Sequence, residues 1–175
     1  MYTRWRSFFM RASKGKNSYR LTLGASPADT AAVRFAFEQP PAWREAEPQT
    51  ELPRLHLRRD SVEVVSFLVN DSEPARLLLV GPVRLAVEAR LNFAKGALGR
   101  KGFSLAVFEN DRQLAARDFD VRRLKAGRYA DRKDIFPSVS KRLSLDIPAG
   151  AHSLVVRFGG GTGASGALRF LVRNK

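Results

Sequence analysis

Alternation of apolar and polar residues with a period of two is the feature of this sequence that most constrains its fold. The clearest run reads "VRLAVEARLNF", in which every second residue from Val83 to Phe93 is apolar and most of the residues between them are polar. Shorter runs with the same alternation lie at 103–107, 143–147 and 154–158. Because successive side chains of a strand point to opposite faces of a sheet, each run predicts a half-buried strand of an antiparallel sheet.

Further segments rich in apolar and β-branched residues also indicate strands, and turn signals separate most of them. These further predicted strands lie at 19–24, 32–37, 55–58, 62–69, 75–81, 113–120 and 167–172. Predicted turns lie at 70–74, 81–82 ("GP"), 94–102, 109–112, 147–150 ("IPAG") and 159–166. The sequence therefore predicts an all-β fold, a single jelly-roll-like β-sandwich of about ten to eleven antiparallel strands.

The length of 175 residues suits one domain spanning residues 1–175. Residues 1–18 are basic and predict either a hairpin or a short amphipathic helix. They lack the uninterrupted apolar stretch of about 7–15 residues that a secretory signal needs, and no apolar run is long enough for a transmembrane segment. The compartment stays open: the periplasm or exterior if a signal was removed, otherwise the cytoplasm.

Catalytic and metal-binding patterns are missing from the sequence. There is no cysteine and there are only two histidines, His56 and His152, which argues against a zinc site. The glycine-rich segment at 159–166 lacks the lysine and hydroxyl residue of a P-loop. Asp118 and Asp120 alternate among arginines, as expected of solvated ion pairs. We therefore predict a protein that is not an enzyme and uses no cofactor.

A formal net charge of +14 is the strongest compositional feature. Residues 1–20 carry +6, residues 21–89 carry −3 and residues 90–175 carry +11. Arginine outnumbers lysine 23 to 8, which a GC-rich genome also produces without functional demand. The uneven distribution favours a real basic face, which would attract acidic partners.

The candidate ligand-binding residues lie mainly in two basic loops. They are Arg100, Lys101, Arg122, Arg123, Arg128 and Arg132, with Tyr129 and Trp43 for stacking. Arginine forks suit carboxylate, sulfate or phosphate groups, and an exposed aromatic ring can stack on a sugar or a base. Long connections such as these, at 121–138 and at 38–54 around Trp43, are often functional. The competing interpretation is a solvated loop without a partner.

The order of elements in the second half resembles the jelly-roll accessory and carbohydrate-binding modules of bacterial proteins. A long strand follows "VGP", a basic loop comes next, and "IPAGAHSLVV" precedes a closing hairpin, all within residues 80–175. The resemblance concerns the fold and includes no diagnostic motif. We predict a non-catalytic binding module for an acidic polysaccharide or an acidic protein surface. The alternatives are a structural or assembly domain of an envelope or secreted complex, and a nucleic-acid-binding protein, which only the charge supports.

Overall fold

A computed structural model describes residues 42–59 and 62–174, all within the second of two compact units into which the chain divides, Gln39–Lys175. The described residues form no helix, and hence none that could cross a membrane. The strands are β1 (Arg44–Ala46), β2 (Arg54–Arg59), β3 (Val62–Asn70), β4 (Ala75–Ala94), β5 (Arg100–Glu109), β6 (Arg112–Arg122), β7 (Arg128–Tyr129), β8 (Ile135–Pro137), β9 (Lys141–Gly159) and β10 (Ser165–Asn174). The strands predicted at 19–24 and 32–37, and the hairpin or helix at 1–18, lie outside the described residues, and the single domain over 1–175 stays a prediction.

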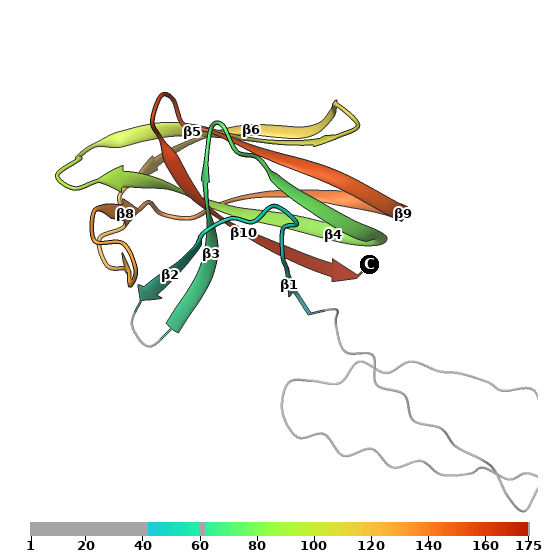
Figure 1. Cartoon of the computed structure of the whole chain (residues 1–175), viewed down its shortest axis with the longest axis horizontal. Helices are drawn as coiled ribbons and strands as arrows, with labels where there is room; N and C mark the ends of the chain where they lie inside the picture. Colours follow the sequence, from blue (N-terminus) through green and yellow to red (C-terminus); the bar gives the residue numbers. More distant parts are fainter. Residues whose placement is uncertain (1–41, 60–61, 175) are drawn as a thin grey trace, which may run out of the picture. The chain divides into compact units, whose positions relative to one another are not determined.

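The strands form one antiparallel sheet in the order β6-β5-β9-β4-β10-β3-β2-β7, with β1 added to β10 and β8 to β4. The sheet folds over itself, so that β5 and β6 lie above β10, β3 and β2 in Figure 1. Side chains of the two layers meet across the core: a Cβ at Gly166 of β10 would lie 2.5 Å from the ring of Phe158 on β9. The predicted all-β sandwich is confirmed.

The period-two alternation in the sequence correctly predicts which residues of β4 are buried in the core. Alternate residues of β4 from Val83 to Phe93 are buried and belong to the main hydrophobic cluster, as the sequence pattern predicts. Phe103 of β5 packs against Phe119 and Phe158, with ring centroids 5.2 and 5.4 Å apart. Burial of these large side chains on both layers is the main force that holds the sandwich together.

Two predicted turns are wrong. "GP" at 81–82 lies inside β4 and "IPAG" at 147–150 lies inside β9, so no hairpin precedes His152. The two breakers face each other: Gly81 pairs with Gly150, and the register shifts between Gly81 and Val83. Glycine and proline are tolerated within a strand at a bulge, where one residue does not join the ladder. Each pair of predicted shorter strands is therefore one long strand.

Both long predicted loops contain strands. The segment 38–54 contributes β1, which pairs with β10, and the segment 121–138 contributes β7 and β8. The second segment crosses the face of the sheet that points away from the main core, called the outer face below. There it covers a small apolar cluster with Leu55 and Leu57 of β2, Ala167 of β10 and its own Tyr129.

Candidate functional site

Four of the predicted basic residues meet at one end of the sandwich, called the basic end below. Arg100, at the start of β5, pairs directly with Arg122, at the end of β6. Lys101 and Arg123 follow them in the chain, and Arg123 forms a bridge to Ser138 after β8. Because β5 begins and its antiparallel neighbour β6 ends here, the fold brings together basic residues that are about twenty positions apart in sequence.

Two of these cations rest on a pair of aromatic rings. Phe93 of β4 and Phe136 of β8 are cross-strand partners. The Lys101 ammonium lies 5.7 Å from the centroid of Phe93, and the Arg123 guanidinium lies 3.6 Å from that of Phe136. Such contacts hold a cation in place, and a guanidinium stacked on a ring keeps its in-plane N–H donors free for an anion.

Acidic neighbours already compensate two other predicted ligands. Arg100 Nε lies 2.6 Å from Asp120 Oδ2. Arg132 donates two hydrogen bonds to Asp134, of 2.8 and 2.6 Å, and they lower the pKa of Asp134 to about 2. Asp134 therefore remains ionised at neutral pH. Lys101, Arg122 and Arg123, in contrast, have no carboxylate partner within the described part of the chain.

Tyr129 and Arg128 do not join the basic end. Arg128 sits on β7 opposite Arg58 of β2. Tyr129 is only 3% exposed, and its hydroxyl donates a 2.8 Å hydrogen bond to Asn92 Oδ1. Burial raises the pKa of Tyr129 and outweighs the opposing effect of the Arg90 charge, so the phenol stays protonated. The ring covers the sheet, and stacking of Tyr129 on a ligand is therefore a wrong prediction.

Phenylalanine at position 129 tests this role. We expect Tyr129→Phe to lower the free energy of unfolding by about 1–2 kcal/mol, because Asn92 loses a buried partner while the ring keeps its packing. Urea denaturation measures the change. Binding of polyanions at the basic end should be unaffected, and a variant with native stability and weaker binding would restore Tyr129 as a ligand residue.

Trp43 is half-buried and lies neither in the core nor free on the surface. The guanidinium groups of Arg142 on β9 and Arg173 on β10 lie over its ring, 5.7 and 5.0 Å from the centroid. Position 43 precedes β1, whose first residue, Arg44, pairs with Val172 of β10. Trp43 therefore lies on the outer face of the sheet and is not part of the basic end.

A hollow of about 220 Å³ opens on the outer face, called the outer-face groove below. Its lining comes from three neighbouring strands and one loop residue: Val64 and Ser66 of β3, Glu88 and Arg90 of β4, Ala167 and Arg169 of β10, and Ser140. Sequence analysis missed this set. The available signal was the polar face of the alternating strands, on which Glu88 and Arg90 stand.

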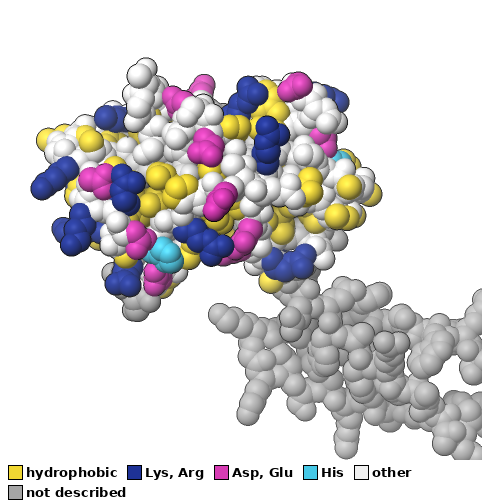
Figure 2. Space-filling model, viewed as in Figure 1, with side chains coloured by type: hydrophobic (Ala, Val, Ile, Leu, Met, Phe, Trp, Pro, Cys, Tyr) yellow, Lys and Arg dark blue, Asp and Glu magenta, His cyan; other side chains and the backbone are white. Residues whose placement is uncertain are grey.

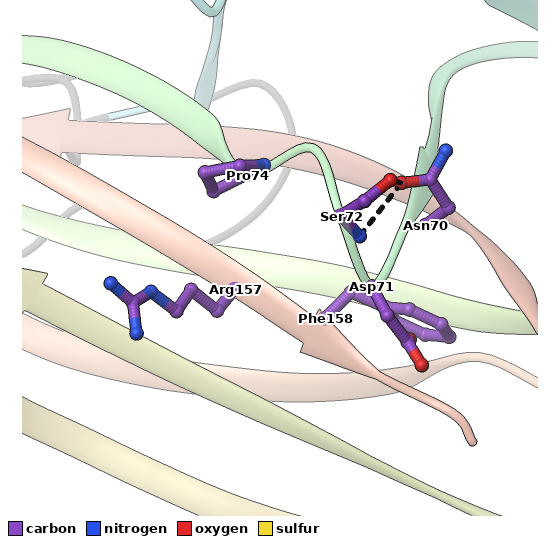
Figure 3. A pocket seen from close by; sticks show the side chains of 6 residues that line it. All are labelled: Asn70, Asp71, Ser72, Pro74, Arg157 and Phe158. Atoms are coloured by element: carbon purple, nitrogen blue, oxygen red, sulfur yellow. Dashed lines mark hydrogen bonds between the residues drawn. The ribbon is translucent and has the colours of Figure 1, made fainter. Parts of the chain in front are cut away.

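A second hollow, of about 230 Å³, lies beside the β3–β4 turn and is lined by Asn70, Asp71, Ser72, Pro74, Arg157 and Phe158. Its polar groups serve the turns: Asn70 Oδ1 accepts hydrogen bonds from the backbone N–H groups of Ser72 and Glu73, and Asp71 Oδ1 accepts one from Gly160. Figure 3 shows the Asp71 carboxylate and the Arg157 guanidinium pointing away from each other. This hollow has no convergent set of groups.

In residues 42–59 and 62–174, no three His, Asp or Glu side chains are placed to hold a metal ion. Each histidine is paired with a single glutamate, His56 with Glu63 at 2.9 Å and His152 with Glu109 at 2.8 Å. Figure 2 shows basic and acidic side chains interleaved over the visible face. On this face, the positive charge is therefore divided among local clusters.

Comparison with known proteins finds solved structures of low similarity to this chain. No family model matches the sequence, and no curated protein matches it. Two carbohydrate-binding modules with solved structures are similar to this chain. The module CBM6cm-2 of Cellvibrio mixtus lichenase 5A, in complex with cellotriose, has a TM-score of 0.37 and 12% identity over 77% of this chain and 97% of that one. The module CBM36, in complex with calcium and xylotriose, has a TM-score of 0.37 and 9% identity over 74% and 97%.

A third solved structure contains a further module of this kind together with a catalytic one. It holds the CBM22-1 and GH10 modules of Clostridium thermocellum xylanase 10B complexed with xylohexaose, with a TM-score of 0.33 and 12% identity over 75% of this chain and 28% of that one. At identities of 9–12%, the sugars bound by those modules are not assigned to this chain.

Proposed function

We propose that this domain is a non-catalytic binding module that captures an acidic carbohydrate at its basic end. The observation that carries the proposal is the placement of Lys101, Arg122 and Arg123 at one end of the neighbouring strands β5 and β6, with no carboxylate partner among the described residues. Lys101 and Arg123 lie over the aromatic pair, and Arg122 lies beside them on the opposite face of the strand pair. Cations without an internal carboxylate partner remain available to interact with an external anion. The rings of Phe93 and Phe136 hold two of these cations in place, which reduces the entropy that binding costs.

Carboxylates along a polyuronate chain match this arrangement. A guanidinium fork binds a carboxylate with two parallel hydrogen bonds, while lysine acts as a point charge. The site is an exposed surface, so salt screens its interactions strongly. Affinity for a polyuronate should therefore be moderate and should fall steeply as salt concentration rises.

The test removes the two adjacent arginines. In Arg122→Ala/Arg123→Ala we expect affinity for polygalacturonate to fall about 10-fold at low salt. The plot of log affinity against log salt should become shallower by about one to two units, because two contacts are lost. Calorimetric titrations of the full chain at several salt concentrations measure both quantities.

A matched control removes equal charge elsewhere on the same strand. Arg112 and Arg117 are exposed residues of β6, and both lie away from Arg122, where β6 reaches the basic end. Arg112→Ala/Arg117→Ala should change the affinity for polygalacturonate less than about 2-fold. Equal losses in the two double variants would mean that only net charge matters and would overturn the proposal. Tighter binding of single-stranded DNA than of polygalacturonate, lost in the same variant, would make the basic end a nucleic-acid site.

A further inference from the structure

We infer that the outer-face groove is a second ligand site, for an uncharged ring that carries several hydroxyl groups. It goes beyond the proposed function, because it involves other residues, another face of the sandwich and a ligand of different charge. Its volume of about 220 Å³ is below the range of roughly 300–1,000 Å³ typical of sites for drug-sized ligands. The groove therefore suits a single ring, either alone or as one unit of a chain.

Alternating charges cross the sheet at this position, and they form what we call the charge ladder. Glu45 of β1, Arg169 of β10, Glu88 of β4 and Arg142 of β9 stand on four adjacent strands. Arg169 Nη2 lies 2.5 Å from Glu45 Oε1, and its Nη1 lies 3.6 Å from Glu88 Oε2. Arg142 donates a hydrogen bond to Glu88 Oε1. The ladder thus compensates its own charges.

Because the charges of the ladder compensate one another, the groove favours a ligand without a net charge. An anionic ligand would meet the carboxylate of Glu88, and a cationic one would meet Arg169. Hydroxyl groups suit both, because each can donate to a carboxylate and accept from a guanidinium. The side chains of Glu88 and Arg169 are 23% and 28% exposed, so hydrogen bonds made there are stronger than on an open surface.

The floor of the groove leaves space for a ring. Ala167 and Ser66 are short side chains, both buried, and Val64 beside them is half-buried. Ala167 also belongs to the apolar cluster that the 121–138 segment covers, so the groove lies directly beside the covered part of the outer face. Tyr129 lies over the apolar cluster at Leu55 and Leu57, and its segment is fixed by a 2.6 Å hydrogen bond from Arg90 to the Ser138 carbonyl.

Beyond the groove, the charge ladder continues to an aromatic residue that is not part of the lining. Arg142, the last member of the charge ladder, also lies under Trp43, which it shares with Arg173. The groove offers both donors and acceptors, from Arg169, Glu88 and Ser140, which a ligand with several hydroxyl groups can use. The ladder keeps these groups in fixed positions before a ligand arrives, which lowers the entropic cost of binding.

The experiment uses the full chain and neutral oligosaccharides. We expect calorimetry at high salt to detect binding of at least one series among cello-, xylo- and manno-oligosaccharides, with affinity nearly independent of salt. Ser140 is exposed at the rim, outside any strand, and Ser140→Trp should fill the groove without removing any member of the charge ladder. Both Ser140→Trp and Glu88→Gln should weaken this binding at least about 10-fold.

Controls separate this site from the basic end. Ser153→Trp adds the same side chain at an exposed position of β9 outside the groove, and should leave neutral binding unchanged. Arg122→Ala/Arg123→Ala should also leave it unchanged while weakening polygalacturonate. Absence of neutral binding at millimolar oligosaccharide, or full binding by Ser140→Trp, would overturn the inference. Either result leaves the test of the basic end unaffected, because that test uses a different ligand and different variants.

Discussion

Replacing Gly81 with alanine is expected to lower the free energy of unfolding by more than about 3 kcal/mol. A Cβ at this position would lie 1.6 Å from the carbonyl oxygen of Pro148 and 2.7 Å from its carbonyl carbon. Both atoms belong to the backbone of β9, which is paired with β4 on either side of the bulge. The strands therefore cannot accommodate the methyl group by moving a side chain. Urea denaturation of the full chain measures the loss.

Gly102 provides the matched control for this substitution. It also lies within a strand, β5, but a Cβ there would meet only the carbonyl oxygen of Phe119, at an ordinary 3.8 Å. Gly102→Ala should change stability by less than about 1 kcal/mol, and the reduced freedom of the unfolded chain favours a slight gain. Similar stabilities for the two variants would contradict the close contact between β4 and β9.

The bulge also shows where prediction of strands from sequence fails. Alternation identified the core face of the segment from Val83 to Phe93, because burial on one face of a sheet leaves a period-two signal in a single segment. "GP" and "IPAG" were interpreted as turns, because each breaker was considered alone. Their actual role depends on Gly81 standing opposite Gly150 across the ladder, which no single segment reveals.

The sequence identifies the basic residues proposed for the site but not their surroundings in the fold. Basic residues near 100 and 122 could be identified from composition, and antiparallel pairing of β5 and β6 brings them together. The sequence could not show that Asp120 compensates Arg100, since that contact depends on the twist and rotamers of an exposed strand pair. Tyr129 looked exposed because its segment is polar, whereas tertiary packing folds that segment over Leu57.

The outer-face groove was invisible for a different reason. Glu88 and Arg169 stand on the polar faces of alternating strands, where charged residues are usually only solvated. Their relation arises from the pairing of β4 with β10, two strands separated by more than seventy residues of chain. Long-range pairing of this kind leaves no local pattern, so the charge ladder becomes evident only in the folded sheet.

Truncation of Phe93 is the second large effect that we expect. Phe93 is fully buried, with 0% of its surface exposed, at the end of the run whose alternation defines the core. Phe93→Ala should lower the free energy of unfolding by about 3–5 kcal/mol, the usual cost of a cavity left by a buried phenylalanine. The variant also removes the ring beneath Lys101 and the cross-strand partner of Phe136, on which Arg123 rests.

Two measurements on Phe93→Ala therefore separate packing from binding. Denaturation gives the stability loss, for which Leu98→Ala is the control: Leu98 is 85% exposed, and its truncation should cost less than about 0.5 kcal/mol. Titration of the folded variant with polygalacturonate, well below its unfolding midpoint, reports on the cations. Weaker binding than wild type would mean that the aromatic pair positions Lys101 and Arg123. Native affinity with reduced stability would show that Phe93 serves the core alone, and that the cations bind without support from the rings.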